Sequence, residues 1–325
     1  MTEKEMYTDW CDKQSNIPMF LQPWWMDAVC AGKQWNVILV YRQEIAGQSE
    51  TATPDEVVAA MPYLLSKRLW MTAILMPQET PYGGIWIAED ASATKVCEVI
   101  QRKLAAMNLC YYYQQFVVGS PCPPVMKALQ FKVRTRNTYQ LCDLSNLDNV
   151  IDHFSKNKKR QLQKALSLHA ERGMNVEAFY RFHMHCMEEQ KKKLSYTREF
   201  LLVLERKTKR LEQSDIIQIK NADGLVYAAA YVVWDDRFLY YLMPCYDPAH
   251  KESGAGALLA LEAIKLAREK GVSFDFEGSM NHGIANHYKQ FGSSATTYYS
   301  VSKLYKWYYL FALLGNKLRN LKYGM

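Results

Sequence analysis

Three stretches in the first half of the chain have counterparts in the second half, in the same order. The residues "VVAAMPYLL … LWMTAILMPQETPYGG" parallel "VYAAAYVV … RFLYYLMPCYDPAHK". Further along, "KLAAMNLCYYYQQF" parallels "KLAREKGVSFDFEG", and "KALQFKVRTRNTYQLCDL" parallels "YKQFGSSATTYYSVSKL". Each match is weak, but chance would not favour the shared order. We therefore expect two copies of one unit, in residues 1–148 and 149–325, with the boundary near Asp148.

Patterns typical of strands and of helices alternate within each copy. Strands are expected at 35–41, 57–65, 70–76, 109–118, 216–220, 225–234, 237–244, 272–276 and 298–304. Helices are expected at 93–107, at 155–172, at 256–270, and in a long region, 176–213, that breaks near "KLSYT". The alternation predicts an α/β (α+β) fold in each copy.

The composition limits the classes of protein to which this chain can belong. Hydrophobic residues make up 49% of the 325 positions, which is enough for a buried core. The net charge of +7 suits an anionic ligand such as a nucleotide, RNA or a lipid headgroup, but many proteins that bind none of these are as basic. The eight cysteines form no CxxC pair, the N-terminus has no secretory pattern, and the longest apolar run is too short to span a bilayer. We expect a soluble, cytoplasmic protein.

The stretch "HKESGAGALLALEAIKLAREKG" places Gly254 and Gly256 just before a strongly helical run. The first amides of a helix have no partner within it and carry partial positive charge, so they suit an anion or an oxyanion. Glycine there permits a close approach. Alternatively, the first turn is simply rich in glycine, with Ser253 as its N-cap. No Gly-x-Ser-x-Gly, Walker or Gly-x-Gly-x-x-Gly motif is present, which argues against the corresponding hydrolases, NTPases and dinucleotide enzymes.

The pattern Lys251-x-x-Gly254-x-Gly256 resembles the pyrophosphate-binding signature of the GNAT acyltransferases, with Lys251 in place of the usual Gln or Arg. The segments "FSKNKKRQLQKALSLHAERGMNVE", "KKKLSYTREFLLVL" and "NHYKQFGS" are similar to Fem-type peptidyltransferases and their acetyltransferase relatives. The resemblance implies tandem GNAT-like domains, each a mixed, strongly twisted sheet flanked by helices, of which the first is degenerate. It also implies a donor-binding loop, made of Lys251, Ser253, Gly254, Ala255, Gly256 and Ala257.

The same resemblance implies roles for five residues in catalysis. Lys289, after Tyr288, is similar to the family's lysine that faces the acyl group, where an ammonium would stabilise an oxyanion; the alternative is a solvated lysine. Asp275 and Glu277 alternate along a strand and so should point the same way. One of them could accept a proton from the incoming amine, or both could hold Lys289 and nearby backbone. A tyrosine near the preceding strand, for which we choose Tyr241, would protonate a thiol leaving group.

Four further residues are candidates for substrate binding: Arg160, Lys164, Tyr196 and Tyr246. Arg160 and Lys164 share one helix face and could meet a phosphate, but a solvated basic helix is the favoured explanation. No metal site is expected, because the two histidines of "HMHC" (183–186) diverge around a helix. The aromatic, basic C-terminal segment could rest on a membrane surface or pack on its own domain.

These observations predict an N-acyltransferase that moves an acyl or aminoacyl group to an amine. The donor is acyl-CoA, for example acetyl-CoA, or an aminoacyl-tRNA as in Fem-type enzymes that build peptidoglycan cross-bridges. Those that use tRNA often carry a long helical arm, whereas region 176–213 is only long enough for the fold's own helices, so acyl-CoA is slightly favoured. The acceptor would be a small molecule or a cell-wall precursor, and no DNA partner is expected. The alternative is a non-catalytic module that holds a nucleotide-sugar, a lipid-linked precursor or another protein.

Overall fold

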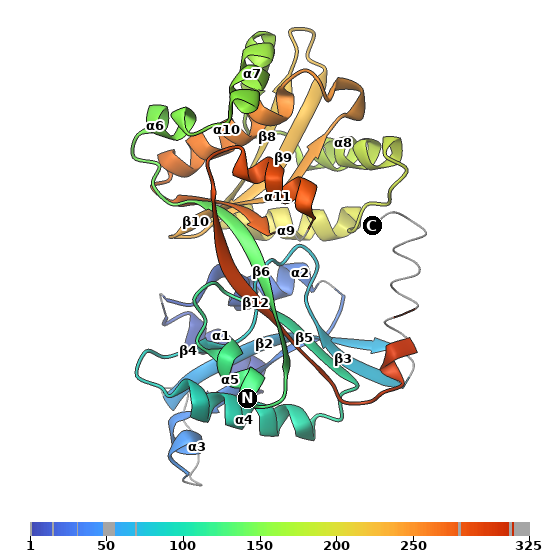
Figure 1. The fold of residues 1–325 in the computed structure, drawn as a ribbon. Helices are drawn as coiled ribbons and strands as arrows, with labels where there is room; N and C mark the ends of the chain where they lie inside the picture. Colours follow the sequence, from blue (N-terminus) through green and yellow to red (C-terminus); the bar gives the residue numbers. More distant parts are fainter. Residues whose placement is uncertain are drawn as a thin grey trace. The chain divides into compact units, whose positions relative to one another are not determined.

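The computed structural model describes residues 2–14, 16–30, 32–47, 56–68, 70–278, 281–311 and 314 (Figure 1). The chain separates into two units. The first unit contains Met1–Arg136 and Thr297–Leu318, and the second contains Asn137–Thr296. Each unit is built around its own set of hydrogen-bonded strands.

The first unit has the strand order β1-β2-β3-β5-β12, with β4 paired to β2. These strands are β1 (Trp35–Tyr41), β2 (Val57–Arg68), β3 (Met71–Leu75), β4 (Trp86–Ile87), β5 (Tyr111–Phe116) and β12 (Ser294–Leu304). The helices are α1 (Glu3–Cys11), α2 (Pro23–Val29), α3 (Arg42–Ala46), α4 (Ala93–Ala106) and α5 (Cys122–Ala128). β3 and β5 are parallel, and α4 is the connection between them.

The second unit has the strand order β6-β11-β10-β9-β8-β7. These strands are β6 (Lys132–Leu141), β7 (His169–Glu171), β8 (Ser214–Lys220), β9 (Val226–Trp234), β10 (Phe238–Tyr246) and β11 (Ser273–Gly278). The helices are α6 (Leu147–Asp152), α7 (Lys156–Lys164), α8 (Val176–Glu189), α9 (Arg198–Arg210), α10 (Ala255–Glu269) and α11 (His282–Lys289). β10 and β11 are parallel, and α10 is the connection between them.

The order of elements repeats along the chain, and the two copies exchange their last strand. Both contain an antiparallel pair, a parallel crossover through a helix, and then a short helix and a long strand. β6, the last strand of the first copy, pairs with β11, while β12, the last strand of the second, pairs with β5. The predicted division at Asp148 therefore differs from the two units. Their boundary falls inside β6 and again inside β12, where no turn residues mark it.

Most elements expected from the sequence are present within a few residues of their predicted bounds. The strand expected at 35–41 is β1, and the region 176–213 is α8 and α9 with a break between them. The helix expected at 155–172 is wrong in its second half. α7 ends at Lys164, and His169–Glu171 form β7 because they pair with the edge of β8. β6 and α11 were not expected.

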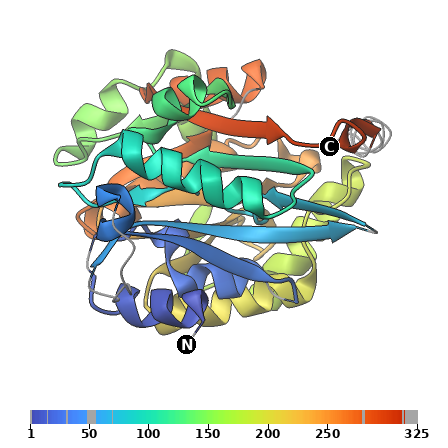
Figure 2. The same cartoon turned by 90° about the horizontal axis from the view of Figure 1, so that it is seen from below.

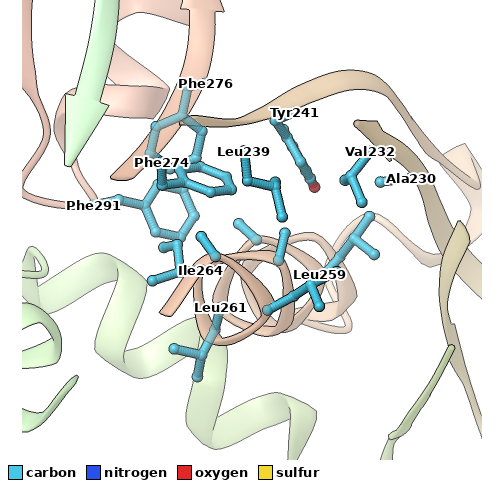
Figure 3. Close-up of a cluster of buried hydrophobic side chains, with 14 of the residues drawn as sticks. Ala230, Val232, Leu239, Tyr241, Leu259, Leu261, Ile264, Phe274, Phe276 and Phe291 are labelled. Carbon is cyan, nitrogen blue, oxygen red and sulfur yellow. The ribbon is translucent and has the colours of Figure 1, made fainter. Parts of the chain in front are cut away.

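The core of the second unit surrounds α10. Alternate residues of β9, among them Ala230 and Val232, face α10 together with Leu239 and Tyr241 of β10 (Figure 3). Nine of the fifteen residues of α10 are buried, which agrees with its nearly continuous apolar sequence. Burying one leucine such as Leu259 contributes about 2 kcal/mol, so α10 is anchored firmly. α8 contacts β9 and β10, and α9 contacts β8.

The core of the first unit lies between α4 and its sheet. Val96, Cys97 and Ile100 of α4 are buried against Tyr112 and Phe116 of β5, and Figure 2 shows α4 (teal) running in roughly the same direction as the neighbouring strands. All eight cysteines are unpaired, and seven of them are buried. Among the described residues, no helix is both long and apolar enough to cross a membrane.

Candidate active site

The crossover β10-α10-β11 creates the candidate site. Because β10 and β11 are parallel, their carboxyl ends lie at the same edge of the sheet, and α10 begins there. The register pairs Phe238–Tyr240 with Ser273–Asp275. β10 then continues to Tyr246 and β11 to Gly278. We call this region, where both strands end and α10 starts, the α10 entry.

Two glycines shape the α10 entry for reasons within the protein itself. Gly254 is the N-cap, with φ 84, and a Cβ there would lie 2.0 Å from the carbonyl oxygen of Gln161 in α7. A Cβ at Gly256 would lie 3.1 Å from the ring of Tyr246. Gly254 therefore lets α10 begin against a backbone that no Cβ could approach so closely, and Gly256 lets it begin tightly against the Tyr246 ring.

Part of the hydrogen-bonding capacity of the first turn is already used. Ala255 donates its N–H to Ser253 Oγ at 3.2 Å, and Ala257 donates its N–H to the Gly254 carbonyl oxygen at 3.0 Å. Ser253 is thus the residue before the N-cap, not the N-cap itself. An anion at this helix start would depend on Gly254, Gly256 and nearby side chains.

Three tyrosines gather beside the α10 entry. The hydroxyls of Tyr241 and Tyr246 are 3.3 Å apart, and the ring of Tyr288 stacks on Phe276 with centroids 4.7 Å apart. Burial raises the pKa of Tyr246 to about 12, and burial also raises the pKa of Tyr241. The pKa of Tyr288 is raised by burial first, then by Tyr246, Glu277 and Asp275. All three hydroxyls stay protonated at neutral pH and can donate a hydrogen bond or a proton.

Asp275 is a fully buried carboxylate with several donors. It accepts hydrogen bonds from the hydroxyl of Thr138, from Gln140 Nε2 at 2.9 Å and from the Glu277 N–H at 2.7 Å. Thr138 and Gln140 lie on β6, so this carboxylate ties the exchanged strand to β11. The arrangement supports the structural role for Asp275.

Glu277 departs from the extended backbone that its strand predicts. Its φ is 65, and the register of β11 with β6 shifts between Asp275 and Gly278. The simple strand alternation on which the expected common direction of Asp275 and Glu277 rested is therefore interrupted at this position. A left-handed φ at a residue with a Cβ is strained, and such strain occurs most often at functional positions.

Lys289 lies at the C-terminal end of α11 and is exposed. Its Nζ is 6.0 Å from the centroid of the Tyr139 ring, and that ring lies 6.0 Å from the ring of Tyr288. Lys289 therefore sits next to the tyrosine cluster with its ammonium on the solvent side.

The family model for the acetyltransferase (GNAT) domain matches residues 152–290. This range contains the α10 entry, the three tyrosines, both carboxylates and Lys289. Residues 152–290 form a GNAT domain. The predicted resemblance to the GNAT acyltransferases is thereby confirmed for these residues, and the domain is that of an N-acyltransferase.

Solved structures extend the likeness in fold to the whole chain. FemX has a TM-score of 0.66 at 12% identity, covering 92% of this chain and 96% of its own. A tandem GNAT protein from the clavulanic acid biosynthesis pathway has a TM-score of 0.54 at 10% identity, covering 93% and 94%. L-PGS from Bacillus licheniformis has a TM-score of 0.52 at 10% identity, covering 93% and 92%. No curated protein matches the chain in sequence.

Helix α7 adds basic side chains to the GNAT domain next to the α10 entry. Lys164 Nζ lies 3.9 Å from the carboxylate of Glu252, in the loop that precedes Gly254. Arg160, one turn earlier, is exposed and donates to Asn157 Oδ1 at 3.1 Å. Lys251 is also exposed. The structure therefore places Lys164 beside the predicted donor loop, where its partner is the carboxylate of Glu252.

A buried pair in the GNAT domain escaped the sequence analysis. Lys158 is 1% exposed, and its Nζ lies 3.1 Å from Gln161 Oε1 and 3.1 Å from His287 Nδ1. Burial lowers the pKa of Lys158 to about 8, and burial with the nearby Lys158 lowers the pKa of His287 to about 4. The pair ties α7 to α11. Lys158 belongs to a run of lysines, and no spacing distinguishes it from its solvated neighbours.

Tyr196 belongs to a different cluster. Its hydroxyl lies 2.8 Å from His183 Nδ1, and its ring packs near Tyr180 and Phe200. Burial lowers the pKa of His183 to about 4, so this histidine is a neutral core residue. Among the described residues, no group of three or more His, Cys, Asp or Glu side chains is placed to hold a metal ion.

Proposed function

We propose that the protein transfers an acyl group from acyl-CoA to an amine at the α10 entry. One observation carries the proposal: the strand-helix-strand crossover places a glycine-built helix start against Tyr246. Tyr241 lies next to that ring, and Tyr288 is close enough to both Tyr246 and the strained Glu277 for each of them to raise its pKa. The combination offers an anion site, proton donors and a carboxylate within one small volume.

The donor would bind at the start of α10. Its phosphates would meet the partial positive charge of the helix, with the cations of Lys251, Lys164 and Arg160 at the margin. Ser253, Ala255 and Ala257 would support the loop, since their bonds fix the shape of the first turn. Tyr196 lies in another cluster, so any role in binding the acceptor would require the acceptor to reach α8.

The transfer itself needs a proton acceptor, an oxyanion partner and a proton donor. The nitrogen of the amine forms a bond to the acyl carbon, and its proton passes to Glu277, because Asp275 already accepts three hydrogen bonds. The tetrahedral oxyanion is stabilised by the Lys289 ammonium and the Tyr288 hydroxyl. The carbon–sulfur bond then breaks, and the thiolate takes a proton from Tyr246, with Tyr241 supporting that hydroxyl.

Aminoacyl-tRNA is the second candidate donor. It is favoured by the exposed cations of α7 and by the net charge of +7. Acyl-CoA is favoured because α8 and α9 have only 14 and 13 residues and contact the strands of their own unit. The acceptor would be an amine on a small molecule or a cell-wall precursor, and the protein would work in the cytoplasm.

The donor can be identified by titrating the full chain with acetyl-CoA, CoA, UDP-linked sugars and aminoacyl-tRNA. Calorimetry should show saturable binding of acetyl-CoA and CoA, and mass spectrometry of acceptor mixtures should show an added acyl group. Saturable binding of aminoacyl-tRNA alone would select the second donor. Binding of UDP-sugars without transfer would instead indicate a binding module.

The roles of the residues can then be separated. Tyr246→Phe should lower kcat roughly 100-fold with acetyl-CoA, since it removes a proton donor, whereas Tyr180→Phe on α8 is the matched control. Lys289→Ala should lower kcat by a similar factor and leave acetyl-CoA binding nearly intact. Unchanged kcat in either variant would remove that residue from the mechanism.

A further inference from the structure

The first unit contains a basic cavity that the GNAT domain does not use. Its volume is about 630 Å³. It is lined by Tyr111, Tyr113, Gln130, Lys132, Arg134, Arg136, Ser300, Ser302, Lys303, Leu304 and Leu310. Four of these side chains are cationic and none is acidic. A cavity of this size and charge is suited to a phosphate-bearing ligand.

Three of the cations come from one strand and reach one face. Lys132, Arg134 and Arg136 alternate along β6, so their side chains leave the same side of the sheet. Arg136 donates from Nη2 to the Tyr113 hydroxyl at 3.0 Å, while its Nε is buried and has no partner among the described residues. A buried guanidinium nitrogen without an acceptor is costly, and an anionic oxygen in the cavity would satisfy it.

Apolar and aromatic side chains stand next to the cations. Leu304 and Leu310 line the cavity itself. Trp307 is 70% exposed and Phe311 is 67% exposed. Their segment is held in place because Tyr309 stacks on Tyr111 of the cavity with ring centroids 5.3 Å apart. An exposed apolar group of this kind beside a basic site is typical of an interaction surface.

We propose that this cavity binds the headgroup phosphate of an anionic lipid, with Trp307 and Phe311 entering the membrane interface. The cations would hold the phosphate, and tryptophan and phenylalanine favour the boundary between headgroups and acyl chains. A nucleic-acid backbone would use the same cations but gain nothing from a leucine-lined margin. The membrane contact considered for the C-terminal segment would thus involve a specific ligand, the lipid headgroup, bound in the first unit.

The test is sedimentation of the full chain with vesicles of phosphatidylcholine alone or mixed with phosphatidylglycerol. Wild type should sediment with the mixed vesicles, and less so at high salt, because salt screens the attraction. The double variant K132E/R134E should bind at least roughly 30-fold more weakly, given about 1 kcal/mol for each basic residue at an anionic surface. The double variant W307S/F311S should also bind more weakly.

The matched control is K95E/R102E, which changes the charge equally at exposed positions of α4, on the other face of the first unit's sheet. It should keep nearly full vesicle binding. Circular dichroism melting curves should coincide for all variants, since the replaced residues are exposed.

Four results would overturn the proposal. If wild type sediments no more with vesicles that contain phosphatidylglycerol than with phosphatidylcholine alone, an anionic lipid ligand is excluded. Equal losses of vesicle binding in K132E/R134E and K95E/R102E would show that only the net charge matters. Unchanged binding of W307S/F311S, together with competition by glycerol phosphate, assigns the cavity to a soluble phosphate compound. Loss of tRNA binding in K132E/R134E without loss of vesicle binding assigns it to nucleic acid.

Discussion

Helices α4 and α10 occupy the same place in the two copies, each joining two parallel strands, yet they begin differently. In the sequence parallel, Ala91 and Ala93 stand where the second copy has Gly254 and Gly256. α4 starts at Ser92 with no side-chain cap, while α10 starts at a left-handed glycine against α7. In the first copy the crossover helix only packs on its sheet, whereas in the second copy the start of the helix is also packed closely against α7.

The strands that follow these helices differ in the same way. Asp275 and Glu277 of β11 correspond to Tyr113 and Gln115 of β5, so only the second copy has carboxylates there. The comparison teaches that the fold alone does not make the site. A glycine start, a buried carboxylate and a strained glutamate occur together in the GNAT domain, and the first copy has none of them at these positions.

Gly254→Ala should give the largest effect. We expect a loss of about 4 kcal/mol in the free energy of unfolding, because a left-handed backbone and an overlap with the Gln161 carbonyl oxygen add together. Gly271→Ala isolates the backbone contribution, since its φ is 72 with no atom within 4 Å, and should cost about 1 kcal/mol.

The reciprocal change, Ala91→Gly in the first copy, should cost about 1 kcal/mol or less. Urea unfolding measures all three variants. Equal losses for Gly254→Ala and Gly271→Ala would mean that the approach to α7 has no structural importance.

Acid should destabilise the second unit selectively, because all seven histidines lie in it. His183 and His287 have folded-state pKa values near 4, below the ordinary 6.5, so the folded state binds fewer protons between these values. Their stabilising contribution is present above pH 6.5 and is lost as the pH falls towards 4. Allowing for their partial exposure to solvent, the two together contribute on the order of 3 kcal/mol. Hydrogen exchange of each unit across this interval measures the loss.

His287→Gln should flatten that profile, whereas His185→Gln, at an exposed position on α8, should leave it unchanged. If the first unit, which has no histidine, lost stability equally, the loss could not be assigned to these two residues.

Asp275→Asn should have a smaller effect, about 2 kcal/mol, because an amide accepts the hydrogen bonds of Thr138 and Gln140 less well than a carboxylate. Tyr113→Phe, the corresponding position in the first copy, should cost about 1 kcal/mol. Urea unfolding again provides the measurement. A larger loss for Tyr113→Phe would reverse the order that the comparison requires.

Much of the fold follows from the sequence, since nearly continuous apolar runs predict buried strands such as β1 and β9, and a longer apolar run predicts α10. β6 was missed because its exposed half, with Lys132, Arg134 and Arg136, has no apolar alternation. The exchange of β6 and β12 was missed because pairing between distant strands leaves no mark at the boundary.

The site was predictable only in part. The glycines and tyrosines stand in recognisable positions, and the structure brings Tyr241, Tyr246 and Tyr288 together. The partners of Asp275 and the strained φ of Glu277 arise from the packing of β6 against β11, which no local pattern reports. The same holds for the Lys158–His287 pair between α7 and α11.

The most direct test of the central claim is amide hydrogen exchange at the two helix starts, with and without acetyl-CoA. We predict that exchange slows at Gly254–Leu258 when acetyl-CoA is added, while the start of α4, from Ser92 to Val96, is unchanged. Acetyl-CoA that binds without slowing exchange at the α10 entry, or that slows both helix starts equally, would contradict the account.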